Sequence, residues 1–202
     1  MSLKTILKEK LLIVEGKDEE NFFNEFINIM SLNDIQIHSL EGTGSFRAKL
    51  GAVVDTNGFD NVKVLGIERD ADEDPQATFI SICDALREYG LPVPTECISP
   101  VNASRKVSVM VIPTQSDKGM LEDICLKSIE NDHSFKCTEN YFNCLIKSGI
   151  DINPDLSKRK VQAFLCSKPE LVSCLGLAAK KGYWPFDDRA FDNIRKFLEV
   201  FR

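Results

Sequence analysis

Three acidic residues stand where a metal site for phosphate chemistry is expected. Glu15 directly follows the apolar run of residues 11–14, while Asp70 and Asp72 come shortly after the apolar run of residues 62–67. Short continuous apolar runs are typical of strands buried on both faces of a parallel sheet. Because ligands bind beyond the carboxyl ends of such strands, we expect these acids to lie side by side in space.

The spacing of Asp70 and Asp72 favours a shared cation. Residues i and i+2 of an extended segment point the same way, and two converging carboxylates repel unless a cation lies between them. Mg²⁺ (or Mn²⁺) takes one or two carboxylates together with waters and phosphate oxygens. Glu15, if free of the metal, could move protons. The competing interpretation is that the acids only solvate a loop. Asp74, which precedes Pro75, is better interpreted as a helix N-cap.

The elements that must position these acids alternate along the chain. Strands are expected at 11–14, 35–40, 62–67 and 107–112, with helical spacing between them. This order predicts an α/β fold, with a Rossmann-like parallel sheet flanked by helices. Beyond about residue 130 the strand signals fade and helical patterns continue. We therefore predict an α/β domain over residues 1–130 and a mainly helical C-terminal extension, residues 131–202, packed on it.

Glu122 is the candidate for a fourth acid at the site. It belongs to the segment after the strand expected at 107–112, in a helix predicted to begin near Asp117. The alternative is a solvated first helical turn, where the helix dipole favours acids; for Asp123 we prefer that interpretation. The basic runs 158–160 and 180–181 are interpreted as helix-surface charge, with contact to a nucleic-acid backbone as the alternative.

Small and basic residues near the predicted strand ends could contact a phosphate. Glycine lets the backbone approach a ligand closely, N–H groups at a helix start bind anions, and basic side chains supply charge. The candidate phosphate-binding residues are Gly16, Lys17, Gly42, Gly44, Arg69 and Lys118. A plain turn is the alternative for residues 42–44, and a surface position is the alternative for Lys118.

Composition excludes several classes of protein. The 202 residues are 43% hydrophobic and 28% charged, which is typical of a globular protein with a sizeable core. The net charge of −6 argues against binding nucleic acid through bulk electrostatics. Seven cysteines without a CxxC pair argue against a structural zinc site. No signal-peptide segment or membrane-spanning run is found, so we expect a cytoplasmic protein with no membrane partner.

Two motifs resemble the Toprim domain of topoisomerases, bacterial primases, recombination mediators and overcoming-lysogenization-defect nucleases. They are residues 12–16 followed by Asp18, and Asp70-Ala71-Asp72 after an apolar strand. The whole chain most resembles DUF3226, a stand-alone Toprim-like family, and the segment 183–198 resembles its C-terminal part. The resemblance therefore covers nearly the full length. One departure is Glu68-Arg69, which stands where further apolar strand residues are expected.

The resemblance implies a Toprim-type fold and a role for each matching acid. Glu15 matches a general acid/base or metal-associated glutamate, and Asp70 and Asp72 match a metal-binding pair. Nuclease-type Toprim domains use additional acids, for which Glu122 is the candidate. The implied function is Mg²⁺-dependent phosphotransfer, foremost a nuclease acting on DNA or RNA phosphodiesters. The alternative is a non-catalytic, metal-dependent module that binds nucleotides or nucleic acid.

Overall fold

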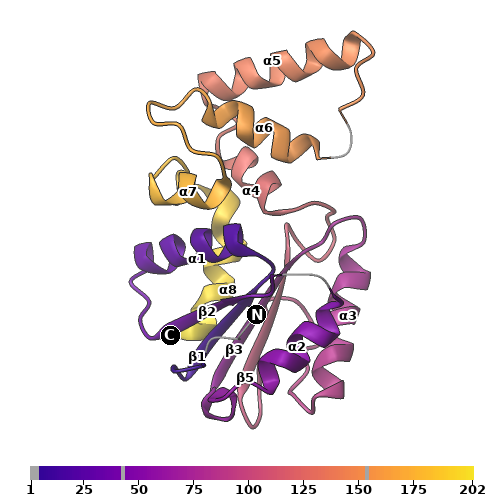
Figure 1. The fold of residues 1–202 in the computed structure, drawn as a ribbon, viewed down its shortest axis with the longest axis vertical. Helices are drawn as coiled ribbons and strands as arrows, with labels where there is room; N and C mark the ends of the chain where they lie inside the picture. Colours follow the sequence, from indigo (N-terminus) through magenta and orange to yellow (C-terminus); the bar gives the residue numbers. More distant parts are fainter. Residues whose placement is uncertain (1–4, 42–43, 153–154) are drawn as a thin grey trace.

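A mostly parallel sheet forms the centre of the molecule. The computed structural model describes residues 5–41, 44–152 and 155–202 (Figure 1). Within them the strands are β1 (Lys10–Val14), β2 (Ile35–Ser39), β3 (Val64–Asp70), β4 (Val101–Asn102) and β5 (Lys106–Ile112). Their order is β2-β1-β3-β5-β4, and only the short β4 runs antiparallel to its neighbour. The predicted α/β fold with a parallel sheet is confirmed.

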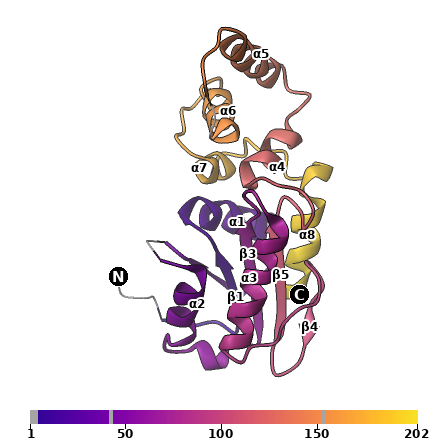
Figure 2. The same cartoon turned by 90° about the vertical axis from the view of Figure 1, so that its right-hand side faces the viewer.

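Helices cover both faces of this sheet and extend beyond one of its ends (Figures 1 and 2). The helices are α1 (Lys17–Ile29), α2 (Phe46–Val54), α3 (Pro75–Glu88), α4 (Leu121–Ser128), α5 (His133–Lys147), α6 (Leu156–Leu165), α7 (Leu175–Lys180) and α8 (Asp192–Leu198). Short 3-10 turns are η1 (Phe59–Asn61), η2 (Arg189–Phe191) and η3 (Glu199–Phe201). None of the described helices is long and apolar enough to cross a membrane.

Each sheet face has its own apolar core, as the two-residue periodicity of strands requires. Leu11, Ile13 and Ile67 pack with α2 and α3 on one face. Leu12 and Val14 pack on the other with α1, α4, α6, α7 and α8. The C-terminal helices therefore share a core with the sheet, which confirms a helical C-terminal part packed on it. The division at residue 130 stays a prediction.

The end of the chain returns to the middle strand of the sheet. A Cβ at Gly66 of β3 would lie 2.6 Å from Phe201 and 3.1 Å from Phe197, so glycine leaves the room that these rings fill. Phe197 and Phe201 are both fully buried. Burying one CH₂ group contributes about 0.8 kcal/mol to stability, and burying these two rings contributes several times that amount. The last helix is thus part of the main core.

Local chemistry explains where several helices begin. Asp74 caps α3 by accepting a hydrogen bond from Ala77 N–H at 2.9 Å, and Pro75 occupies the first turn, as predicted. The helix predicted to begin near Asp117 instead begins at Leu121. The Thr114 hydroxyl accepts the backbone N–H groups of Ser116 and Asp117, which holds this segment as a turn.

Candidate metal centre

Acids from two strand ends and two helix starts converge at the carboxyl end of the sheet. Glu15 follows β1, and its Oε2 accepts the backbone N–H of Asp70, the last residue of β3, at 3.3 Å. The Oδ1 of Asp70 accepts the N–H of Leu121, the first residue of α4, at 3.0 Å. The strand-end meeting of Glu15 and Asp70 expected from the sequence is therefore present in the structure.

Asp70 is a half-buried carboxylate among other carboxylates. Burial raises its pKa well above the ordinary value, and the charges of Glu19, Glu122 and Glu15 raise it further. The hydrogen bond from Leu121 N–H lowers the pKa and offsets part of this increase. An added cation would relieve both the burial penalty and the mutual repulsion.

Glu68 lies beneath Asp70 on the same face of β3 and is fully buried. Neither of its carboxyl oxygens meets a hydrogen-bond partner among the described residues. Burial raises the pKa of Glu68 well above the ordinary value, and the charges of Asp70, Glu19 and Glu15 raise it further. The nearby backbone N–H of Glu15, although outside hydrogen-bond geometry, offsets part of the increase. A buried, unpaired carboxyl is costly and calls for a functional explanation.

Glu19 and Glu122 complete the cluster from the first turns of α1 and α4. Burial raises the pKa of each; the charges of Asp18 and Glu15 raise that of Glu19 further, and the charge of Glu19 raises that of Glu122. The charge of Lys158, an exposed residue in the first turn of α6, lowers the pKa of both. The cluster therefore combines carboxylates from four elements, with the charge of Lys158 acting on two of them.

Asp72 lies apart from the buried acids. β3 ends at Asp70, and Asp72 has a φ of 48°, so the extended backbone assumed for an i, i+2 pair does not continue to it. Its backbone pairs with Gly119, and the residue is exposed. The i, i+2 pair that shares a face of β3 is Glu68 and Asp70. Asp72 as a metal ligand stays a prediction.

Gly16 and Lys17, two of the phosphate-binding candidates, lie beside neighbouring carboxylates. Gly16 precedes α1 with extended backbone, and a Cβ there would lie 2.8 Å from Glu19 Oε2. Glycine at this position thus makes room for the Glu19 carboxylate. Lys17 pairs with Glu20 at 2.9 Å on the surface.

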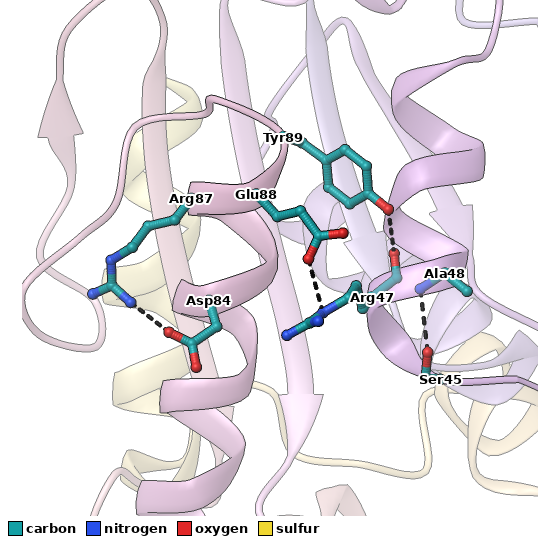
Figure 3. Close-up of polar contacts among 7 residues, drawn as sticks. All are labelled: Ser45, Arg47, Ala48, Asp84, Arg87, Glu88 and Tyr89. Atoms are coloured by element: carbon teal, nitrogen blue, oxygen red, sulfur yellow. Dashed lines mark hydrogen bonds and ion pairs between the residues drawn. The ribbon is translucent and has the colours of Figure 1, made fainter.

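The loop before α2 is occupied by its own contacts (Figure 3). Gly42 lies outside the described residues, and Gly44 has a φ of 123° with open space around it. Ser45 accepts the N–H of Ala48 at 3.3 Å and so caps the helix itself. Arg47 pairs with Glu88 of α3 at 3.1 Å. These contacts fit a capped turn that packs α2 on α3.

Arg69 contacts a member of the acidic cluster, whereas Lys118 pairs outside it. Arg69 Nε lies 3.5 Å from Glu15 Oε2, and its guanidinium stacks 5.1 Å from the Phe46 ring centroid. It is therefore placed to hold Glu15 or to turn toward a phosphate. Lys118 pairs with the exposed Glu73 at 3.0 Å, a surface contact worth little in water.

The donor set fits a hard divalent cation. No three Asp, Glu, His or Cys side chains among the described residues already surround a common metal position. Mg²⁺ does not need such a cage, because it keeps several waters and uses one or two carboxylates. The buried oxygens of Glu68, without hydrogen bonds, adjoin Asp70 and would gain a partner in a cation.

Three members of the cluster were not predicted to act at the site. Glu19 stands four residues after Glu15 at a helix start, a spacing that places side chains near one another. Glu68 stands two residues before Asp70 within one strand, so it shares that face. Local sequence offers no comparable signal for Lys158, because its position depends on how α6 docks.

Close packing of α7 on α1 supports the acidic helix start. Asp18 Oδ1 accepts the N–H of Gly176 at 2.9 Å. A Cβ at residue 176 would lie 2.6 Å from both Asn21 Cβ and the Asp18 carbonyl oxygen. The Gly176→Ala variant is therefore expected to be less stable by about 1–3 kcal/mol. Urea denaturation measures this change, and Leu177→Ala, an exposed position on the same helix, should have a smaller effect.

Comparisons with known proteins agree with this architecture. Two solved structures share the fold, both C-terminal regions of OLD proteins. That of Burkholderia pseudomallei has a TM-score of 0.55 and 14% identity over 97% of this chain and 98% of the other. That of Xanthomonas campestris pv. campestris has a TM-score of 0.54 and 14% identity over 97% and 95%. The search of curated proteins gives no match.

The likeness in fold agrees with the α/β architecture predicted from the sequence. The family described as "Protein of unknown function (DUF3226)" matches residues 9–202, which includes every member of the acidic cluster. The chain therefore belongs to the DUF3226 family.

Proposed function

We propose that this protein cleaves DNA or RNA phosphodiesters with the help of Mg²⁺ or Mn²⁺ bound at the acidic cluster. The observation that carries the proposal is Glu68, a fully buried carboxyl without a hydrogen-bond partner among the described residues, next to Asp70. A protein core does not retain a buried, unpaired carboxyl for stability, because an apolar residue of similar volume is usually better tolerated there. The likeness to the OLD protein C-terminal regions supports a nuclease-related context.

The roles follow from the position of each side chain. Glu68 and Asp70 would hold the metal, with Glu19 and Glu122 close enough to contribute or to hold a second ion. When bound, the metal would orient a phosphate, lower the pKa of a water and stabilise the leaving oxygen. Glu15 accepts a hydrogen bond from Asp70 N–H and is about 40% exposed, so it can exchange protons with solvent. Lys158, whose charge lowers the pKa of Glu19 and Glu122, would attract the phosphate anion.

A cavity beside the cluster provides space for a substrate. It has a volume of about 600 Å³ and includes Asp72, Lys118, Met120 and Ser157 in its lining. It opens between the loop after β3, the loop before α4 and the first turn of α6. A nucleotide flanking the reacting phosphate would fit this position, with Asp72 at its edge.

A cleavage assay tests the proposal directly. The protein is incubated with single-stranded DNA, double-stranded DNA and RNA, in Mg²⁺, in Mn²⁺ and in EDTA. We expect cleavage that needs the metal and that is lost in Asp70→Ala. Wild-type protein indistinguishable from Asp70→Ala in both metals would reject the proposal. Tight Mg²⁺-dependent nucleotide binding without turnover would instead support a non-catalytic binding module.

A further inference from the structure

Asp123 joins the start of α4 to the start of α6. Its Oδ2 accepts the backbone N–H of Met120 at 2.8 Å, which caps α4. Its Oδ1 accepts the hydroxyl of Ser157, in the first turn of α6. Both oxygens of one carboxylate are thus used, one within α4 and one across to the helical region. A charged acceptor makes each of these bonds stronger than a neutral one would be.

The segment that carries Asp123 is itself fixed to the end of β3. Gly119 and Asp72 exchange two backbone hydrogen bonds, each 3.0 Å long. Gly119 has a φ of 131°, and a Cβ there would lie 2.4 Å from Asp123 Oδ2, so glycine is needed on both counts. Leu121 N–H binds Asp70 Oδ1. Asp123 is therefore held in a fixed position relative to Asp70 of the acidic cluster.

The start of α6 depends on this contact more than the rest of the helix does. Asp155, which precedes α6, has a φ of 72° and its side chain makes no capping hydrogen bond. The second half of α6 is held by the buried Val161, Phe164 and Leu165. Removing the Ser157 hydroxyl should therefore loosen the first turn without detaching the helix.

We propose that the Asp123–Ser157 hydrogen bond is a positioning contact that holds the adjacent Lys158 over the acidic cluster. This inference rests on the proposed function of that cluster. Lys158 directly follows Ser157, whose partner Asp123 directly follows Glu122, so the backbone at Lys158 lies beside the acidic start of α4. Consistent with this position, its charge lowers the pKa of Glu122 and of Glu19. A lysine stem has four rotatable carbons, so a fixed backbone at its root restricts where the ammonium can lie. Asp123 and Ser157 thus act through Lys158 and do not themselves contact the reacting atoms.

A double-mutant cycle in the cleavage assay tests the contact. The variants are Ser157→Ala, Ser157→Thr, Lys158→Met and the double variant Ser157→Ala/Lys158→Met, with Ser148→Ala as a remote serine control. Ser148 caps the end of α5 through a hydroxyl bond to Cys144, far from the cluster in the chain. We expect Ser157→Ala to lower kcat roughly tenfold while KM changes little, since misplacing a catalytic group is costly.

The proposal also predicts rescue and non-additivity. Ser157→Thr keeps the hydroxyl and should stay within about twofold of wild type, as should Ser148→Ala. In the Lys158→Met background, Ser157→Ala should cause almost no further loss, because residues that act as a unit are not additive. A full additional loss in that background, or wild-type kcat in Ser157→Ala, would overturn the proposal.

Hydrogen exchange separates this inference from the proposed function. In wild-type protein without metal, the Arg159 amide, which donates to the Asp155 carbonyl at the start of α6, should exchange slowly, and Ser157→Ala should raise its rate while Ser148→Ala does not. Unchanged exchange in Ser157→Ala would reject the contact, whatever the activity. Raised exchange together with absence of any metal-dependent cleavage in wild type would reject the proposed function alone.

Discussion

Replacing Glu68 with methionine is expected to stabilise the metal-free protein by about 1–3 kcal/mol at pH 8, the cost of a buried polar group left without partners. Methionine has a similar length, adapts to irregular gaps and carries no charge. Glu68 is fully buried without hydrogen-bond partners among the described residues, so its removal loses no such contact. Urea denaturation in EDTA measures the change, and Glu88→Met on the exposed side of α3 serves as the control.

The same variant should flatten the pH dependence of stability. Burial and the neighbouring acids raise the pKa of Glu68 in the folded state, so the folded protein binds this proton more tightly than the unfolded chain. The resulting stabilisation is complete below the unfolded pKa and is lost as the pH rises through the folded pKa. Wild type should therefore lose stability as the pH rises above the ordinary pKa of a glutamate. Glu68→Met and Glu68→Gln should lose less, with Asp70 accounting for a remaining slope in the same direction.

Mn²⁺ should reverse the order of stability of wild type and Glu68→Met. Binding to the folded state alone stabilises it by about 2.7 kcal/mol when the metal stands at 100 times its Kd. Wild type should gain this stabilisation, while Glu68→Met, which lacks a carboxylate of the cluster, should gain less. Equal stability of wild type and Glu68→Met in EDTA at every pH, or equal gains in Mn²⁺, would contradict the role given to Glu68.

Replacing Asp70 with asparagine is expected to lower cleavage roughly a thousandfold, which corresponds to about 4 kcal/mol of transition-state stabilisation. Asparagine has the same shape and still offers an oxygen to Leu121 N–H, so the start of α4 should keep its position. What it loses is the negative charge that the cation requires. The assay compares kcat of both proteins at saturating metal, with their urea denaturation curves as a check on folding.

Asp84→Asn is the matched control for this substitution. Asp84 pairs with Arg87 at 2.5 Å on the exposed face of α3 (Figure 3). Its amide variant should retain full activity. Asp72→Asn should cost less than Asp70→Asn because Asp72 is exposed at the edge of the cavity. Activity of Asp70→Asn within about twofold of wild type would show that Asp70 does not hold a catalytic metal.

Much of the fold follows from local patterns. The apolar run of β1, the N-cap Asp74 with Pro75, and the helical spacing near the C-terminus each reflect short-range preferences. These patterns also place Glu15 and Asp70 at strand ends, because a parallel sheet aligns its carboxyl ends at one edge. Their approach was predictable, since β1 and β3 pair directly in the sheet.

Other features depend on where a strand stops and on how distant elements dock. Asp72 stands outside the buried cluster because β3 ends two residues earlier and the backbone turns to pair with Gly119. Burial alone distinguishes Glu68, whose carboxyl would be ordinary on an exposed strand. Lys158 comes near the start of α4 only because α6 packs on α4, and Asp123 joins Ser157 for the same reason.

The sequence by itself determined the α/β order, the strand-end position of Glu15 and Asp70, and their acidic chemistry. Only the tertiary structure decided which acids lie together, and that Lys158 comes near them. The physical reason is that charge and periodicity are properties of neighbouring residues. Desolvation and mutual repulsion, which raise the pKa of Glu68 and Asp70, arise only when separate segments enclose them.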